Sequence, residues 1–460
     1  LAQRIDGEAA PYHSRVSQSS AGSNDLDFET MPFVGRSREL SLMLAAFERS
    51  KAGRTEVIIL EGEAGAGKSR LLSQFLGSAE GMGADVVAGR AFETVSELPL
   101  AAPTEALRTR MDRENAPDDL LTDLWLTELS RLLPELRERY PDLPAITDNS
   151  SLRRGRLFEA VVRLGQALAE RNPLVFVLDD LQWADAATQD LVHYAIRRWT
   201  ECGTPVLVIL AAQNGHSGSA RQLGQWFGGL ERDTPTLRLR LDPLRPREVV
   251  QLIAALAGCS LDAERPEGPL GYLDESRAGK VVSLGKWLAD RTSGHPAYLT
   301  QALRGFLEEG VLVFRQRGES GWVIEIPEAI EAEHDDWLGN LLLSRVQPFI
   351  SERLNQLGEV EGDLLVAAAA LSGRFTDQRL IEVASVDEDT GLRALDVLVQ
   401  ERLLRETEED EAYDFTNGLI RETVYAEAGR ARQRVYQRRA LATDQHTVSH
   451  STPVPQALAV

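Results

Sequence analysis

The chain has 460 residues, 43% of them hydrophobic and 26% charged, which excludes a disordered polymer and leaves room for roughly three globular domains. Its 71 acidic and 50 basic residues give a net charge of −21. A surface of that sign repels phosphate backbones, so this chain is a poor candidate for direct binding of duplex DNA.

Membrane insertion and secretion are not expected. The most apolar runs, 206–212 and 364–371, are far shorter than the ~20 residues that cross a bilayer. Two cysteines, Cys202 and Cys259, are too few for a disulfide scaffold, and no signal-like segment is present, so we expect a cytoplasmic protein. The chain begins at Leu1, which suggests a fragment or processed form of something longer.

The first half of the chain alternates between strand and helix signals. Residues 1–31 are polar and aperiodic and are expected to be a disordered linker, after which a helix runs to about residue 50. Expected strands are 57–60, 85–88, 174–178 and 205–211; expected helical segments are 67–79, 101–140, 152–171 and 186–200. This alternation predicts an α/β domain over 32–242, with a parallel sheet covered by helices on both faces.

Beyond residue 243 strand signals largely stop. Helices near 246–257, 280–292 and 296–309, then a hairpin at 311–326, indicate a small helical domain over 243–344. A further compact unit is expected over 345–440. Residues 441–460 are expected to be a disordered tail or the start of helical repeats.

A phosphate-binding loop is the strongest signal in the sequence. It follows an apolar strand, opens a helix, and reads G-x-x-x-x-G-K-S, with its functional positions at Gly62, Gly65, Ala66, Gly67, Lys68 and Ser69. Backbone N–H groups of such a loop converge on phosphate oxygens, Lys68 pairs with the β- and γ-phosphates, and the Ser69 hydroxyl binds Mg²⁺. Arg70, next along the helix, is included among the nucleotide contacts. The plainer reading is a glycine-rich turn that matches by chance.

Two carboxylates close a buried strand about 110 residues downstream. Asp179 is predicted to hold Mg²⁺, and Asp180 to polarise the attacking water. Alone, the pair would also suit two helix-capping aspartates. The N-K-x-D signature of guanine binding is absent, so ATP or ADP is the expected nucleotide.

The segment 179–185, Asp-Asp-Leu-Gln-Trp-Ala-Asp, resembles the STAND class of signalling ATPases, which are AAA+-related nucleotide switches. Within that class the chain is similar to the module of large bacterial LuxR-type and SARP-type transcriptional regulators, over about 32–440. The resemblance implies a P-loop domain over 32–242, a helical lid over 243–344 and a winged-helix domain over 345–440.

Three further motifs carry the resemblance. Val34, Gly35 and Arg36 match a segment that borders the adenine in the family, although Ser37 replaces its first acid. Pro296, in Ser-Gly-His-Pro, matches a lid motif that packs on the adenine, and proline also simply suits a helix start. Asn417 stands where the winged-helix domain of relatives usually carries a phosphate-facing histidine, so the ADP-bound state is expected to be weaker.

The strand 205–212 departs from the family at its end. Relatives commonly place a γ-phosphate-sensing arginine there, whereas this chain reads Ala-Ala-Gln-Asn over 211–214. Loss of that cation predicts slow hydrolysis. DNA recognition by the winged helix is not expected either, because residues 345–427 hold eight arginines, no lysine and nineteen acids.

Taken together, the motifs indicate an ATP/ADP switch with bound Mg²⁺ that self-associates in its ATP state and answers to an unknown inducer. DNA would be contacted only through domains outside this chain. Two alternatives stay open: an actively hydrolysing AAA+ ATPase, or the same switch coupled to a cyclase, a kinase or a defence effector.

Overall fold

The computed structural model describes residues 31–449, apart from 94–97, 115–119, 147–152, 215–217, 259–274, 318–320, 326–334, 372 and 408–411. The linker predicted over 1–31 therefore lies almost wholly outside the described residues. The chain divides into two compact units. One contains Gly35–Asp242, and the other contains Pro243–Val460 with the few residues just before Gly35.

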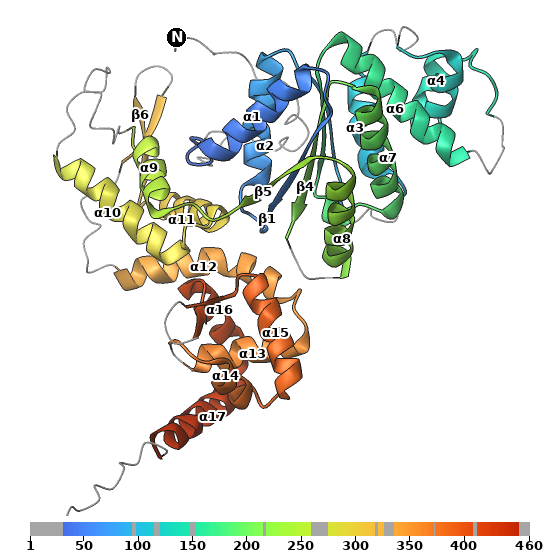
Figure 1. Ribbon diagram of the computed structural model, residues 1–460. Coiled ribbons are helices and arrows are strands. Elements are labelled where there is room, and N and C mark those ends of the chain that lie inside the picture. Colours follow the sequence, from blue (N-terminus) through green and yellow to red (C-terminus); the bar gives the residue numbers. More distant parts are fainter. Residues whose placement is uncertain are drawn as a thin grey trace, which may run out of the picture. The chain divides into compact units, whose positions relative to one another are not determined.

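The first unit is built on a five-stranded parallel sheet in the order β2-β3-β4-β1-β5 (Figure 1). Its strands are β1 (Glu56–Gly62), β2 (Asp85–Arg90), β3 (Leu174–Asp179), β4 (Val206–Gln213) and β5 (Thr236–Leu241). Every residue of β3 is buried, as are all but the last of β4, which is why these strands read as unbroken apolar runs.

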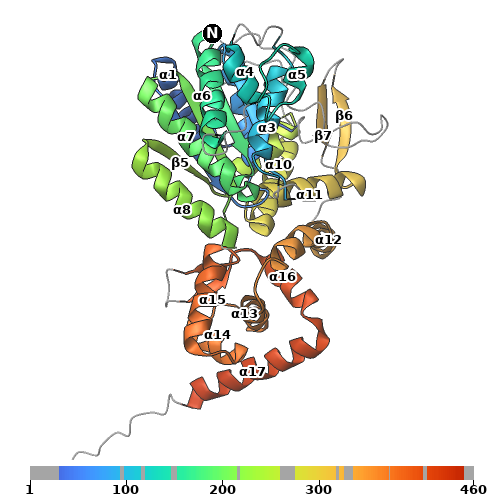
Figure 2. The same ribbon diagram turned by 90° about the vertical axis from the view of Figure 1, so that its right-hand side faces the viewer.

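Helices cover both faces of this sheet, so the predicted α/β architecture is confirmed. On one face lie α1 (Ser37–Lys51) and α2 (Lys68–Gly81), joined by the edge-to-face contact of Phe47 and Phe75. The other face carries α3 (Ala101–Met111), α6 (Arg153–Arg171) and α7 (Ala186–Cys202), which is turned toward the viewer in Figure 2. The short helices α4 (Asp123–Leu129) and α5 (Glu135–Arg139) precede α6, and α8 (Gly218–Asp233) follows β4.

The edge strand β5 was not predicted, and its chemistry explains why. Its sequence Thr-Leu-Arg-Leu-Arg-Leu places charge at every second position. Arg238 forms a two-pronged ion pair with Glu61 of β1, at 2.8 and 2.9 Å, and Arg240 lies 3.4 Å from the same carboxylate. Glu61 is only 8% exposed, so a buried acid gives this polar-looking segment a place in the sheet.

The second unit begins with helices, as expected. These are α9 (Pro246–Leu256), α10 (Glu275–Thr292) and α11 (Pro296–Glu308), followed by the hairpin of β6 (Val313–Arg317) and β7 (Gly321–Glu325). One apolar core joins these helices to the rest of the unit, from α9 to Ala440 of the last helix.

Six more helices and a small hairpin complete the unit. They are α12 (Asp335–Leu354), α13 (Glu359–Ala370), α14 (Asp377–Ala384), α15 (Glu388–Gln400), β8 (Leu404–Glu406), β9 (Tyr413–Phe415), α16 (Gly418–Glu427) and α17 (Gly429–Ser449). Figure 2 looks along α13, around which α14, α15, α16 and α17 pack. An isolated bridge between Phe375 and Tyr413 adds a third short segment to the hairpin.

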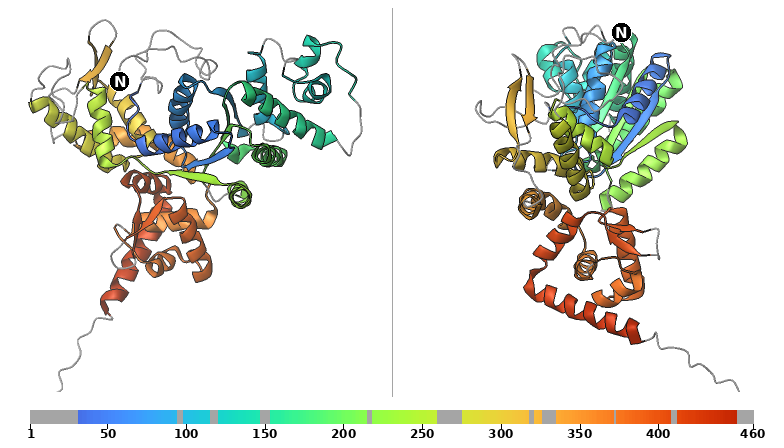
Figure 3. Two further views of the ribbon diagram at one scale, coloured as in Figure 1. Left: turned by 45° about the horizontal axis from the view of Figure 1, so that its top comes forward. Right: turned by 90° about the vertical axis from the view of Figure 1, so that its left-hand side faces the viewer.

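The end of α17 bears on the two alternatives left open for residues 441–460 (Figure 3). The helix continues to Ser449, so the first part of the tail expected over 441–460 is helical; residues beyond 449 are not described. Tyr436, Ala440 and Thr443 are all buried and lie four and three residues apart on one helix face. That apolar stripe carries the helix beyond the boundary set by composition. Among the described helices none is long and apolar enough to cross a membrane.

Candidate functional site

The phosphate loop joins the end of β1 to the start of α2. Gly65 (φ +74°) and Gly67 (φ +91°) both adopt the left-handed conformation that glycine tolerates at little cost. A Cβ on Gly62 would lie 3.1 Å from the Ala66 Cβ and 3.2 Å from that of Leu241, so the loop is closely packed at its base. The loop thus turns tightly into the N-terminus of α2, which is the geometry that presents N–H groups to phosphate.

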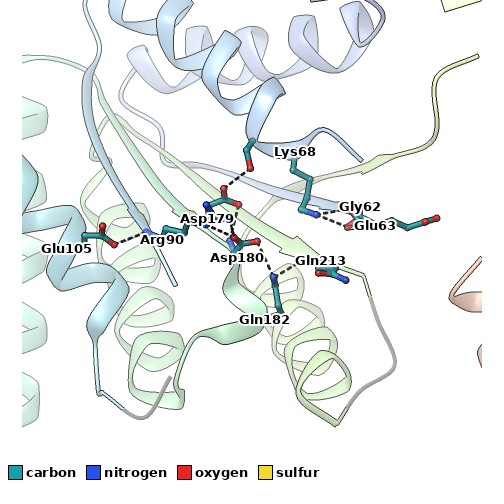
Figure 4. Close-up of polar contacts among 10 residues, drawn as sticks. Gly62, Glu63, Lys68, Arg90, Glu105, Asp179, Asp180, Gln182 and Gln213 are labelled. Atoms are coloured by element: carbon teal, nitrogen blue, oxygen red, sulfur yellow. Dashed lines mark hydrogen bonds and ion pairs between the residues drawn. The ribbon is translucent and has the colours of Figure 1, made fainter. Parts of the chain in front are cut away.

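Lys68 is held inside the loop. Its ammonium donates to the carbonyl oxygens of Gly62 (2.9 Å) and Glu63 (3.0 Å), and the residue is only 7% exposed (Figure 4). Burial lowers the pKa of Lys68, partly offset by attraction to Asp180 and Asp179. A buried ammonium bonded only to neutral carbonyls is well prepared to take a phosphate oxygen as its partner.

Asp179 and Ser69 face each other beside the loop. The Ser69 hydroxyl donates to Asp179 Oδ2 at 3.2 Å, and the Asp180 N–H donates to Asp179 Oδ1 at 2.9 Å. Burial, reinforced by the charge of Asp180, raises the pKa of Asp179. A hydroxyl and a carboxylate oxygen this close suit Mg²⁺, which uses one or two protein oxygens and takes its other ligands from water and phosphate.

Asp180 has an unusual backbone. It lies in the left-handed region (φ +55°, ψ +41°), which aspartate enters more readily than most residues, and it begins the short 3₁₀ turn of Leu181–Trp183. Its Oδ2 pairs with Arg90 at 2.6 Å, and its Oδ1 accepts from Gln182 at 3.0 Å. Both oxygens of the predicted water-polarising group are therefore engaged by the protein (Figure 4).

Arg90 and Gln182 are site residues that sequence reasoning missed. Arg90 ends β2, directly opposite Asp179 in the register of β2 and β3, and its N–H donates weakly to Glu105 of α3 at 3.4 Å. A signal existed: the strand predicted over 85–88 needed only two more residues to bring Arg90 to the carboxyl edge of the sheet. Gln182 was inside the quoted motif but was given no role.

The last acid of that motif, Asp185, has a structural role. Its carboxylate caps α7 by accepting from the N–H and hydroxyl of Thr188, and it also accepts from the N–H of Leu100, which precedes α3. It therefore ties two helix starts together behind the site.

Arg36 also has a position in the first unit. Gly35 and Arg36 are both left-handed (φ +71° and +58°), and the Arg36 guanidinium donates to Ala66 O of the phosphate loop at 3.2 Å and to Asp242 O. Its side chain is 10% exposed, which excludes the plainer reading of an arginine in solvent. Arg70 is partly buried on α2, and Val34 packs against the core of the second unit.

Pro296 and Asn417 lie in the second unit. Pro296 is the first residue of α11, after a turn in which Ser293 and Gly294 are both left-handed, and the carbonyl of Gly294 accepts from Leu244 N–H at 2.9 Å. Asn417 is 4% exposed and caps α16, with its Oδ1 accepting from Leu419 N–H at 2.7 Å. Among the described residues its Nδ2 has no hydrogen-bond partner.

These two segments meet within their unit. Ser293 Oγ donates to the carbonyl of Thr416 at 3.1 Å, so the turn before Pro296 is bonded to the residue before Asn417. The structure thus brings together the phosphate loop, Asp179, Asp180 and Arg36 in one unit, and Pro296 and Asn417 in the other.

Comparisons with known proteins agree with this geometry. Residues 32–209 match the family model of the AAA ATPase domain. This part of the chain has the fold of a P-loop NTPase and matches the AAA-type ATPase domain. The match ends within β4, so the AAA-type domain model covers the phosphate loop and both aspartates but not the second unit.

Two solved structures share the fold at a TM-score of 0.50. The Walker-type ATPase of Pyrococcus abyssi is 13% identical, with 85% of this chain and 96% of that chain covered. The ORC2 protein of Aeropyrum pernix, solved in ADPNP and ADP complexes, is 14% identical, with 91% and 98% covered. At such identities the likeness concerns the fold alone.

A longer relative comes from Rhizobium meliloti (strain 1021). This uncharacterized protein is 24% identical over 430 residues, which is 89% of the present chain. The chain spans only 36% of that relative's length.

Proposed function

We propose that this chain is the ATP/ADP switch module of a signal-responsive bacterial transcriptional regulator of the STAND class. Nucleotide exchange, rather than rapid turnover, controls its opening and self-association. The observation that supports the proposal is the placement of Lys68, Ser69 and Asp179, which suit phosphate and Mg²⁺, beside a β4 end that carries Gln213 and Asn214.

Two features of the AAA-type domain support slow turnover. At the end of β4, Gln213 and Asn214 supply neutral groups where relatives commonly have an arginine. Asp180 is already paired with Arg90, so a protein cation offsets the charge of the carboxylate that would face the attacking water. Both features reduce stabilisation of the transition state without weakening nucleotide binding.

The second unit supports the switching half of the proposal. Residues 359–415 follow the order helix, bridge strand, helix, helix and hairpin, and we assign them to the winged-helix domain that the sequence predicts within 345–440. The bond between Ser293 and Thr416 joins the Pro296 turn to this domain, so the two respond to nucleotide together. Nucleotide shifts a switch only through unequal affinity for its two states, and contacts from Pro296 and Asn417 are the proposed source of that inequality.

The output belongs to parts of a longer protein. DNA contact is assigned to domains outside this chain, and the inducer is unknown. The length of the Rhizobium meliloti relative leaves ample room for such domains in a protein of this kind.

The first experiment is to measure the nucleotide released when freshly purified protein is denatured. Near-stoichiometric ADP supports a closed, slowly exchanging switch. The protein is then given ATP and Mg²⁺, and phosphate release is followed under single-turnover conditions. Fast turnover contradicts the switch and favours a motor-like ATPase, whereas binding with slow turnover supports it.

A further inference from the structure

Gln182 joins the ends of two neighbouring strands through its side-chain amide. Its Nε2 donates to Asp180 Oδ1, just past β3, at 3.0 Å, and its Oε1 accepts from the N–H of Gln213, the last residue of β4, at 2.9 Å (Figure 4). No other side chain in the figure bonds to the ends of both strands.

The orientation of this amide is set by the backbone. Because the Gln213 N–H can only donate, the amide oxygen must face it, and the NH₂ group must therefore face Asp180. The next residue, Asn214, donates its N–H to the carbonyl of Gly62 at 3.2 Å. A connected set of hydrogen bonds thus runs from the base of the phosphate loop through β4 and Gln182 to the Asp180 carboxylate.

The two restraints on Asp180 differ in strength. Arg90 reaches its Oδ2 from a side chain that is 49% exposed, and pairs of this kind contribute little because solvent screens them. Gln182 is anchored at its far end to a strand in the middle of the sheet, between β3 and β1. Gln182 is therefore the more rigid of the two groups that set the rotation of the carboxylate.

We propose that Gln182 is the positioning residue of Asp180, a role that rests on the proposed ATP hydrolysis. In that reaction a water oxygen attacks the γ-phosphorus, Asp180 accepts a proton from the water, and the bond to the β–γ bridging oxygen breaks to leave ADP and phosphate. Oδ2 of the carboxylate faces both Nε and Nη2 of Arg90, each at 2.6 Å, whereas Oδ1 accepts from Gln182 and keeps its second lone pair for the water. Gln182 directs that lone pair by fixing the plane of the carboxylate.

The expected effect is on the rate and not on binding. Misplacing a reacting group by about 1 Å costs about 100-fold in rate, so Gln182→Met should lower the single-turnover rate of ATP hydrolysis by about 10–100-fold. Methionine keeps the length and volume of the side chain and removes both hydrogen bonds. The affinity for a non-hydrolysable ATP analogue with Mg²⁺ should stay within about twofold of wild type, since Gln182 makes no bond to the phosphate loop itself.

A second variant separates the two ends of the amide. Gln182→Glu keeps an acceptor for Gln213 N–H but removes the donor to Asp180, so it should be at least as slow as Gln182→Met. The matched control is Gln189→Met, the same exchange on α7, which should hydrolyse ATP as wild type does. In an Asp180→Asn background, Gln182→Met should cause no further loss.

These variants also separate this inference from the function on which it rests. If Asp180→Asn abolishes turnover while Gln182→Met leaves it unchanged or faster, the positioning role is wrong and the hydrolytic site stands. If Asp180→Asn turns over at the wild-type rate, or the wild type turns over no ATP, the role of Asp180 falls and the inference with it. A Gln182→Met variant that loses rate and analogue affinity together shows a structural role and also overturns the proposal.

Discussion

The phosphate loop of the first unit and the Pro296–Asn417 region of the second use similar local devices and reach different ends. Both place polar groups at helix N-termini beside left-handed turns. In the first unit the side chains point to one place: the Lys68 ammonium bonds to two carbonyl oxygens, and the Ser69 hydroxyl bonds to Asp179, which also accepts from the Asp180 N–H. In the second unit the same devices serve the fold, since Asn417 caps α16 and Pro296 starts α11.

The lesson is that a site within one unit can be judged from its own geometry. Asn417 and Pro296 have structural roles that their own unit shows. Their proposed roles toward nucleotide depend on the other unit and are tested by experiment. The following four experiments test whether that division between the two regions is real.

The largest effect is expected at Lys68. Lys68→Ala should weaken ATP and ADP binding by about 100-fold or more. The reason is that it removes two charge-assisted hydrogen bonds from the ammonium to phosphate oxygens, worth about 1.5 kcal/mol each. It should not lower the melting temperature, since burial opposes the charge of Lys68 in the folded state. Lys51→Ala on α1 is the control, and equilibrium dialysis with labelled nucleotide is the measurement. Unchanged binding would remove the phosphate-site assignment.

The next effect is on the turn before Pro296. A Cβ on Gly294 would lie 1.8 Å from the Leu244 carbonyl oxygen, so Gly294→Ala must displace backbone and should cost more than the ~1–3 kcal/mol of ordinary overpacking. Gly310→Ala is the matched control, because Gly310 has nearly the same φ (+70°) but open space around it, and it should cost only the ~1–2 kcal/mol of a left-handed residue. Urea unfolding distinguishes them. Equal losses would show that the close approach of the Leu244 carbonyl to Gly294 does not restrict this position.

A smaller effect of opposite sign is expected at Asp179. Its pKa is raised by burial, so the folded protein favours the protonated carboxyl, and its ionised form destabilises the fold at neutral pH. Asp179→Asn should therefore raise the melting temperature of nucleotide-free protein by a few degrees at pH 7. That gain should shrink as the pH falls toward the ordinary aspartate value, while the Mg²⁺ dependence of nucleotide binding disappears. A lower melting temperature at pH 7 would contradict this account.

The smallest expected effect separates the two roles of Asn417, which are capping of α16 and the proposed binding of ADP. Asn417→Ser keeps a good N-cap and should leave stability nearly unchanged, whereas Asn417→Ala should cost about 1 kcal/mol. If the buried Nδ2 also serves ADP, both variants should weaken ADP binding to the same extent, by isothermal titration calorimetry. Wild-type ADP affinity in Asn417→Ser would show that Asn417 serves only as the N-cap of α16.

The features that could be predicted from the sequence are those encoded by contiguous residues. The loop from Gly62 to Ser69 and the strand ending in Asp179 carry their own context, so the α/β fold and the phosphate site followed from them. Arg90 and Gln182 did not, because their roles depend on β2 and β4 lying on either side of β3. Chain order does not reveal that arrangement.

Two other differences have a physical cause of the same kind. β5 was missed because its arginines look exposed until Glu61 is seen beside them. The helix that crosses residue 440 was not predicted as one element because the composition of 441–460 is polar, whereas Thr443 packs one turn beyond Ala440. In both cases a tertiary contact outweighs the local signal.

The ion pair between Glu61 and Arg238 also bears on how the sheet is kept in order. β5 is an outer strand, and outer strands with free backbone groups invite pairing with other chains. A slip of one residue would turn both arginines of β5 away from Glu61 and leave a buried carboxylate without its cation. The pairing thus penalises misalignment, and it does so one residue before Gly62, where the phosphate loop begins. The alignment of β5 and the placement of the residue that leads into the phosphate loop therefore depend on the same ion pair.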